Sequence, residues 1–199
     1  MLTVQKVHFE LEKDMALPKE RNSHSFTRDS KNKKIYLFGG AGPEGPLSDL
    51  FELDEETMVW RQLNWAEGGP SAIEMHTGHI YYTEEEKPRL IVVGGRETTF
   101  EPQVAQKFSD EIWEFDFEEK KWTVLCQLPT PIAAHAASLV QNRYLILYGG
   151  TNGAQFFDNI QRFDLQTKEM LMLSSFEGDF TCDFFKMGRL ATQMENAGD

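Results

Sequence analysis

Short runs of apolar residues recur along the chain, and three of them end in a pair of glycines. They occupy residues 35–40, 90–95 and 145–150. The second glycines stand at positions 40, 95 and 150, so both intervals are 55 residues. Each run is short, rich in β-branched, leucine and aromatic residues, and stopped by glycine, which is typical of a strand that ends in a turn. The equal intervals predict an internal structural repeat.

Other signals recur around each glycine pair in a constant order. A histidine precedes the pair, an alternating apolar–polar segment ending in aspartate follows it, and a large apolar residue stands six positions beyond that aspartate. The histidines are His24, His76 and His135. The alternating segments are residues 48–54, 110–116 and 158–164. The large apolar residues are Trp60, Trp122 and Met170.

Each repeat therefore predicts four short strands. The first begins near the histidine, the second ends at the glycine pair, the third is the alternating segment and the fourth begins at the tryptophan or methionine. Turn-forming residues separate the strands, and sustained helical periodicity is missing, so the sequence predicts an all-β fold. The second glycine of each pair is expected to let the chain leave the sheet where a Cβ would clash.

This order of signals resembles the kelch repeat, whose hallmarks are the glycine pair, the strand ending in aspartate and the tryptophan. The resemblance covers about residues 21–173 and implies a kelch-type β-propeller with three recognisable four-stranded blades. Blade one is placed at 21–70, blade two at 71–130 and blade three at 131–173. The structural repeat residues are Gly39, Gly40, Trp60, Gly94, Gly95, Trp122, Gly149 and Gly150.

The tryptophans carry specific expectations. Trp60 and Trp122 should fill the gaps between neighbouring blades. Trp65 falls outside the repeat register and should matter much less. Met170 replaces the third tryptophan, and Arg21 stands where the other repeats have Ile73 and Ile132.

Three blades are fewer than a closed ring needs, because kelch rings usually have about six. Residues 1–20 are expected to supply an end strand of a preceding or closing blade, and residues 174–199 a tail or the start of a further blade. Open blade faces would leave apolar sheet surface uncovered. The chain is therefore interpreted as a fragment or alternative product of a longer propeller; the alternative is that self-association closes the ring.

Charge and cysteine content narrow the functional classes. The chain has 32 acidic and 20 basic residues, a formal net charge of −12, which opposes sequence-independent binding to nucleic acid. No apolar run approaches the roughly 20 residues that cross a bilayer. Two cysteines, Cys126 and Cys182, argue against a secreted protein held by disulfides. These features favour the cytoplasm, with the nucleus as the alternative.

The repeated histidines could converge at the centre of a propeller, where imidazoles suit zinc or copper. The repeat alone, however, places the same residue in every blade. The histidines are therefore expected to be hydrogen-bonded packing residues between blades, and no catalytic residue, cofactor or metal is assigned. The alternative function is a propeller enzyme of the metal-dependent oxidase type, which tightly bound copper, zinc or iron would favour.

The loops between second and third strands should emerge on one face of the propeller, at residues 41–47, 96–109 and 151–157. In blade two, Trp122 stands 27 positions after the second glycine, whereas Trp60 and Met170 stand 20 positions after theirs, a surplus of seven. Loops on a rigid scaffold often carry binding residues, and arginine and aromatic side chains dominate interface hot spots. The candidate partner-binding residues are Arg96, Phe100, Gln103 and Phe156.

The resemblance thus implies a non-catalytic protein-interaction scaffold or adaptor, as in substrate recruitment for ubiquitin ligation or in cytoskeletal and trafficking roles. The expected partner is a protein that binds the loop face, with no nucleic acid and no membrane insertion. Two alternatives stay open. The long loop is an idle insertion that packs its aromatic side chains against the blade, or the chain is an architectural subunit that completes another propeller.

Overall fold

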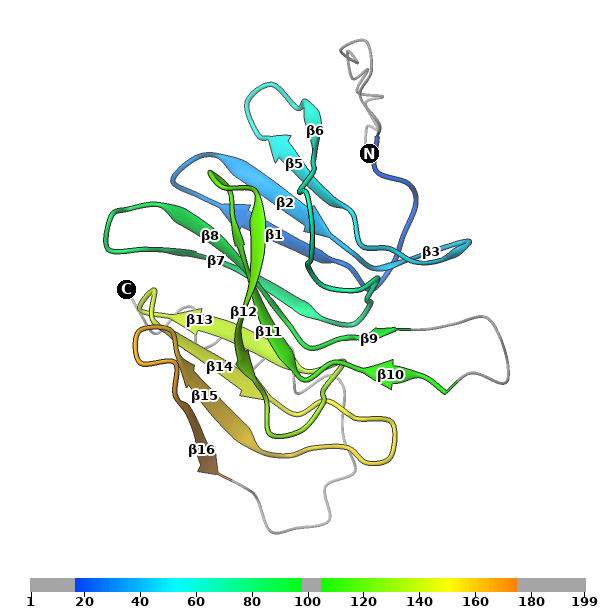
Figure 1. The fold of residues 1–199 in the computed structure, drawn as a ribbon, viewed down its shortest axis with the longest axis vertical. Coiled ribbons are helices and arrows are strands. Elements are labelled where there is room, and N and C mark those ends of the chain that lie inside the picture. Colours follow the sequence, from blue (N-terminus) through cyan, green and yellow to red (C-terminus); the bar gives the residue numbers. More distant parts are fainter. Residues whose placement is uncertain (1–16, 98–104, 175–199) are drawn as a thin grey trace, which may run out of the picture.

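The computed structural model describes residues 17–97 and 105–174 of the 199-residue chain. Its regular elements are all strands, which form three four-stranded antiparallel sheets and two short two-stranded ribbons (Figure 1). The prediction of an all-β fold with three four-stranded blades is confirmed. The sheets do not close into a ring, as expected of part of a propeller. Within the described ranges there is no helix long and apolar enough to cross a membrane.

The four strands of every blade lie side by side in chain order, as the repeat predicts. Blade one contains β1 (Ser25–Asp29), β2 (Lys34–Phe38), β5 (Leu50–Asp54) and β6 (Trp60–Leu63). Blade two contains β7 (Thr77–Tyr82), β8 (Pro88–Val93), β11 (Glu111–Asp116) and β12 (Lys121–Gln127). Blade three contains β13 (Ala136–Val140), β14 (Tyr144–Tyr148), β15 (Ile160–Asp164) and β16 (Met170–Ser174).

The predicted blade divisions at 70/71 and 130/131 fall in the links between these sheets. At the end of blade three, β16 runs one residue past the predicted limit of 173. Cys126 lies within β12. The predicted end strand in residues 1–20 and the predicted tail from 174 lie almost wholly outside the described residues.

Alternation along the strands turns one face of each blade toward the preceding blade and the other toward the next. On β8, Leu90 and Val92 pack toward blade one, whereas Ile91 and Val93 pack toward blade three. All four side chains are at most 1% exposed. The two contacts between blades, here called the first seam (blades one and two) and the second seam (blades two and three), form the core.

Trp122 confirms its prediction, because it is 4% exposed and fills the first seam. Its ring centroid lies 5.2 Å from that of Phe38 and 5.0 Å from that of Phe115. Trp60 does not lie in either seam. It is half-buried on the other side of blade one, against Phe26 and Phe51. Because the strand period puts Trp60 on the face toward a preceding blade, only such a neighbour would give it the predicted role.

The prediction that Trp65 matters little is at odds with its position. Its ring centroid lies 5.9 Å from that of Trp122 and 6.1 Å from that of Phe115. The link between β6 and β7 passes back over the first seam, and a Cβ on Gly69 would lie 2.7 Å from the Trp122 ring. Repeat register describes the strands, so it misses a side chain that packs from a link.

The second glycine of a pair meets two requirements: a left-handed backbone conformation and a position with no room for a Cβ. Gly40 and Gly95 have φ angles of +92° and +102°, a region that L side chains rarely adopt. A Cβ on Gly40 would lie 2.5 Å from the Asn22 carbonyl oxygen, and one on Gly95 would lie 3.0 Å from that of Glu74. The predicted steric reason for glycine is confirmed, and the crowding group is the link that enters the blade's own first strand.

Candidate protein-binding face

The loops after the glycine pairs emerge on one side of the molecule, as predicted. Figure 1 shows them opposite the β1–β2, β7–β8 and β13–β14 hairpins. Two of the loops begin as ribbons: β3 (Ala41–Gly42) pairs with β4 (Gly45–Pro46), and β9 (Arg96–Glu97) pairs with β10 (Lys107–Phe108). The third is held by a backbone bridge between Thr151 and Phe156. We call these segments, residues 41–47, 96–97, 105–109 and 151–157, the loop face.

Arg96 lies at the base of the long loop and is held there by two side chains. Its Nε donates to Glu74 Oε1 at 3.0 Å, and its NH1 group donates to Gln106 Oε1 at 3.2 Å. The Glu74 side chain is 6% exposed and that of Arg96 is 24% exposed. Arg96 therefore offers little free surface to a partner. Its ion pair with the buried Glu74 carboxylate holds the loop against the link before blade two.

Phe156 has the surroundings of a contact residue, since it is 70% exposed. The neighbouring loop of blade two touches its loop, because a Cβ on Gly153 would lie 2.7 Å from the Phe108 ring. Arg96 makes no hydrogen bond or ring contact with Phe156 within the described residues. Phe100 and Gln103, the other two candidates, lie outside the described residues.

The loop face also contains a cleft of about 360 Å³ that the sequence analysis missed. Its wall is formed by the β3–β4 ribbon with its prolines, together with Asn22 and Glu74 from the links that precede blades one and two. Residues 42–46 contain two glycines and two prolines, and this cluster beside a repeat loop is the signal that could have found the cleft.

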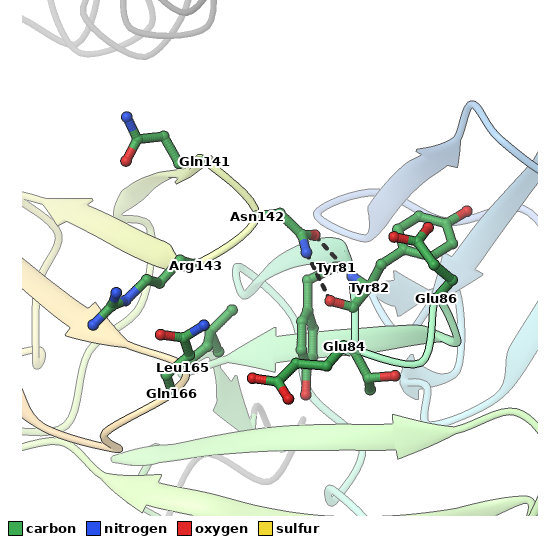
Figure 2. Close-up of a pocket in the computed structure, with 10 residues that line it drawn as sticks. Tyr81, Tyr82, Glu84, Glu86, Gln141, Asn142, Arg143, Leu165 and Gln166 are labelled. Carbon is green, nitrogen blue, oxygen red and sulfur yellow. Dashed lines mark hydrogen bonds between the residues drawn. The ribbon is translucent and has the colours of Figure 1, made fainter.

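The opposite face is closed by contacts between hairpins. A cleft of about 390 Å³ lies between the β7–β8 and β13–β14 hairpins, and Figure 2 shows the residues that line it. Asn142 spans it: its Oδ1 accepts from the Tyr82 amide at 2.8 Å, and its Nδ2 donates to the Tyr82 carbonyl at 2.7 Å. Lys31 pairs with Glu86 across the first seam. Arg143 pairs with Asp164 at 2.7 Å and holds the pKa of that carboxyl near 2.

Two of the three repeated histidines, His76 and His135, stand between blades, as expected, whereas His24 meets the Phe26 ring of its own blade with the ring centroids 6.3 Å apart. His76 Nε2 lies 3.1 Å from Ser25 Oγ of the preceding blade, and His135 Nε2 lies 3.0 Å from Thr77 Oγ1. Burial lowers the pKa of His76 to about 4 and that of His135 to about 3, so both are neutral near pH 7. In residues 17–97 and 105–174, no group of three or more histidine, cysteine or acidic side chains is arranged to hold a metal ion.

Backbone hydrogen bonds reinforce each histidine contact. At the first seam, the Gly40 amide donates to the Ile73 carbonyl at 2.9 Å, and the Ile73 amide donates to the Leu47 carbonyl at 3.2 Å. The Met75 amide donates to the Ser23 carbonyl at 2.9 Å. Together with the bond from His76, these four contacts are here called the clasp of the first seam. Ile73 itself is 2% exposed and packs in the seam's apolar cluster.

The second seam repeats the clasp contact by contact. The Gly95 amide donates to the Ile132 carbonyl at 2.8 Å, and the Ile132 amide donates to the Ser109 carbonyl at 2.9 Å. The Ala134 amide donates to the Met75 carbonyl at 2.8 Å, and His135 completes the set. Met75 and Ala134 both have left-handed backbone, with φ of +58° and +54°. The clasp is thus a repeated backbone device that joins each blade to the one before it.

A family model for the kelch-repeat domain of KLHDC2, KLHL20 and DRC7 matches residues 3–182. The chain belongs to the kelch-repeat family.

Curated kelch relatives are longer proteins. Host cell factor homolog hcf-1 of Caenorhabditis elegans is 26% identical over 153 residues, covering 67% of this chain and 18% of that protein. Kelch domain-containing protein 10 of Xenopus laevis is 25% identical over 176 residues, covering 78% and 39%. A RING finger domain and kelch repeat-containing protein of Dictyostelium discoideum is 26% identical over 164 residues, covering 80% and 15%. The chain therefore spans less than two fifths of each of these relatives.

Arg21 is the main departure within this kelch chain's repeats. It occupies the clasp position of Ile73 and Ile132, yet its side chain turns into its own blade. The guanidinium donates to Asp49 Oδ2 at 2.9 Å and to the Gly39 carbonyl at 3.0 Å. Its side chain is 3% exposed. The ion pair fixes the start of blade one to the turn that follows its second strand.

Proposed function

We propose that the chain is a non-catalytic protein-interaction module that binds a protein partner through its loop face. Membership of the kelch family supports this role, and the observation that carries the choice of face is Phe156. An aromatic ring that is 70% exposed on a loop held by a backbone bridge is costly to leave in water and suited to an interface core. The hairpin face offers charged turns already paired with one another, such as Lys31–Glu86 and Lys87–Glu118.

In this proposal Arg96 is a positioning residue. Its pairing with Glu74 and Gln106 fixes both strands of the β9–β10 ribbon, so the residues between them start from a rigid base. Phe100 and Gln103 stay candidates for direct contact. The finer role we propose is recruitment of a substrate for ubiquitin ligation or adaptor work in trafficking; the RING finger in the name of one kelch relative fits the first.

Comparative capture from native lysate tests the face. The baits are the unaltered chain, Phe156→Ser, a variant with residues 98–105 replaced by Asn-Gly, and a hairpin control, Glu85→Gln. Loop length enters stability only logarithmically, so all four baits should unfold alike. A partner held by the unaltered chain and the hairpin control, and lost from both loop variants, supports the proposal. A partner lost from Glu85→Gln but kept by both loop variants would place the binding face on the opposite side.

The non-catalytic part of the proposal has its own support and test. Two of the three repeated histidines, His76 and His135, serve the clasps as neutral hydrogen-bonding groups, which gives them a structural role. Metal analysis of the purified chain should find copper, zinc and iron well below one equivalent. Stoichiometric copper retained through chelation would favour the oxidase alternative instead.

A further inference from the structure

The cleft on the loop face lies between two walls that the clasp of the first seam holds in place. One wall is the β3–β4 ribbon of blade one, and the other includes Glu74 from the link before blade two. Clasp bonds run from both ends of the ribbon to the residue beside Glu74. The Gly40 amide donates to the Ile73 carbonyl at 2.9 Å, and the Ile73 amide donates to the Leu47 carbonyl at 3.2 Å. The cleft therefore has its shape before any ligand binds, as is usual for binding sites.

Asn22 belongs to the same backbone frame and adds a polar side chain to the cleft. It forms an antiparallel bridge to Ala41 with amide–carbonyl distances of 3.0 and 2.8 Å, and Ala41 pairs in turn with Pro46. Asn22 is exposed, and its Oδ1 accepts from Ser23 Oγ at 2.9 Å. A carboxamide whose oxygen is engaged in this way still carries two N–H donors on Nδ2. The cleft thus has a neutral hydrogen-bond donor that a ligand can reach.

The carboxylates at the cleft already have cationic partners. Glu74 Oε1 accepts from Arg96 Nε at 3.0 Å, and the Glu74 side chain is 6% exposed. Glu44, in the turn between β3 and β4, pairs with Lys19 at 3.8 Å. A further cation would lose hydration for the sake of a carboxylate that is already neutralised, and an anion would gain no partner. The charges of the cleft therefore suit a neutral occupant.

Proline rings supply apolar surface to the cleft. Pro43 is exposed, Pro46 is half-buried, and both line it. Proline and aromatic rings pack well against each other: grooves lined by aromatic side chains bind proline-rich segments, and the same contact serves with the roles reversed. The volume of about 360 Å³ lies near the lower end of the range for ligand pockets. The cleft is thus sized for one large side chain.

Among neutral side chains, tyrosine matches both the prolines and the carboxamide. Its ring offers a flat apolar face, and its hydroxyl oxygen accepts a hydrogen bond from Asn22 Nδ2. Phenylalanine would cover that donor without bonding to it. The indole N–H of tryptophan is a donor only, so it would meet another donor. Tyrosine is also enriched among the interface residues that contribute most to binding.

We propose that this cleft binds one tyrosine side chain of the protein partner. The ring lies against Pro43 and Pro46, and the phenol oxygen accepts from Asn22 Nδ2. This inference rests on the proposed function, because the cleft is part of the loop face, and it names the kind of residue that the partner presents there. Phe156, on the loop of blade three, is a separate contact.

Titration of the full chain with capped peptides, followed by amide chemical shifts in NMR, tests the proposal. The probes are Gly-Gly-Tyr-Gly-Gly and the same peptide with phenylalanine or lysine at its centre. We expect the tyrosine peptide to cause saturable shifts at the amides of Asn22, Gly42 and Gly45. Its binding should be about fivefold tighter than that of the phenylalanine peptide, the usual effect of one neutral hydrogen bond. The lysine peptide should cause no saturable shift at the cleft.

Three variants separate the contributions of the carboxamide and the prolines. Asn22→Ala should lower the affinity for the tyrosine peptide to that for the phenylalanine peptide and leave the latter unchanged, because only the donor is removed. Pro43→Ser should weaken the binding of both peptides. Pro88→Ser, a matched change in the β7–β8 hairpin on the opposite face, should alter neither. Unchanged amide shifts in blade three show that a variant keeps its fold.

Equal binding of the tyrosine and phenylalanine peptides to the unaltered chain would overturn the proposal. So would tighter binding of the lysine peptide, or no shift at the cleft with millimolar tyrosine peptide. Capture from lysate separates this inference from the proposed function. If Phe156→Ser loses the partner while Asn22→Ala and Pro43→Ser keep it, the loop face stands and the tyrosine cleft is wrong. Tyrosine-selective binding by a chain that captures no partner would support the cleft and contradict the proposed function.

Discussion

The first and second seams are held by the same backbone clasp, yet their cores are chemically different. The first seam is aromatic: its buried cluster includes Tyr36, Phe38, Phe115 and Trp122, with Trp65 packed against it. The second seam is mainly aliphatic. Its buried cluster is Ile91, Val93, Ile112, Leu128, Ile132, Leu145, Leu147, Phe163 and Leu165. Phe163 is the one aromatic residue in that buried set.

Ring geometry makes the difference concrete. The Trp122 ring lies within 6.5 Å of four other aromatic rings, with centroid distances of 5.2, 5.9, 6.5 and 5.0 Å. Across the second seam, no two aromatic rings are in contact within the described residues. Rings in tilted or edge-to-face contact contribute beyond the area they bury. The first seam therefore depends on a connected set of rings, and the second on close packing of branched side chains.

Backbone contacts fix the relative position of neighbouring blades, whereas side chains fill the space between them. The clasp bonds differ by at most 0.3 Å between the seams, from 2.9 to 2.8 Å, from 3.2 to 2.9 Å and from 2.9 to 2.8 Å. Backbone and glycine pairs thus set the spacing of neighbouring blades. Side chains then need only reach the required packing density, which rings and branched aliphatics can both supply.

The largest effect is expected at a matched pair of phenylalanines. Phe115 and Phe163 occupy the same repeat position in blades two and three, and both are 0% exposed. Each change to alanine should cost about 3–5 kcal/mol of unfolding free energy, because it opens a cavity in a seam. Phe115→Ala should cost more, since Phe115 also contacts the rings of Trp65 and Trp122. Denaturant titration with unchanged slope measures both.

Leucine variants at the two positions serve as the control. Leucine keeps most of the apolar volume and removes the ring, so Phe115→Leu should remain clearly costlier than Phe163→Leu. Equal losses in the two leucine variants would show that ring contacts add nothing to the first seam and that area alone accounts for both.

Strand order, blade count and the roles of the glycine pairs were predictable because each depends on residues that recur at fixed spacing. Trp122 was placed correctly for the same reason. Trp65 was not, because it packs from a link whose path no repeat specifies. At the loop face, Phe156 is exposed and its partner contact stays a prediction. The pairing of Arg96 with Glu74 depends on two segments 22 residues apart that only folding brings together.

A second effect, shared by both seams, is expected from acid. The folded-state pKa of His76 and of His79 is about 4 and that of His135 about 3, all lowered from 6.5 by burial. The unfolded chain therefore takes up protons first as the pH falls below about 6.5. Each histidine should then lower the free energy of unfolding by about 1.4 kcal/mol per pH unit until the pH reaches its folded-state pKa. Denaturant titrations at pH 7, 6 and 5 measure the loss.

A variant of His79, which is not part of either clasp, measures the effect of one buried histidine alone. His79 is buried, and its Nε2 has no hydrogen-bond partner among the described residues. His79→Leu should therefore reduce the dependence of the unfolding free energy on pH by the share of one histidine. Asp164, with its pKa held near 2, loses its contribution only as the pH falls below 3.8 and does not interfere above pH 5. An unchanged slope in His79→Leu would mean that carboxylates, not histidines, control acid stability.

Removing one clasp hydroxyl should have a more modest effect. Ser25→Ala and Thr77→Val each leave a buried histidine nitrogen without its partner, which should cost about 1–3 kcal/mol. The losses should be similar, because the clasp is common to both seams. Ala136 stands where the other blades have Ser25 and Thr77, and no histidine contacts it among the described residues, so Ala136→Ser should change stability little. A stabilisation as large as the Ser25→Ala loss would show that a donor does face position 136.

The smallest expected effect is the coupling between Trp65 and Trp122, whose rings meet edge to face at 5.9 Å. A double-mutant cycle with alanine at both positions should give an interaction of about 0.5–1.5 kcal/mol, the usual worth of an aromatic pair beyond its buried area. The matched control pairs Trp65→Ala with Phe163→Ala, which lie in different seams and should be additive within about 0.3–0.5 kcal/mol. Additivity in the first cycle would mean that the rings of the first seam act independently, and coupling in the control would mean that blade two passes strain from one seam to the other.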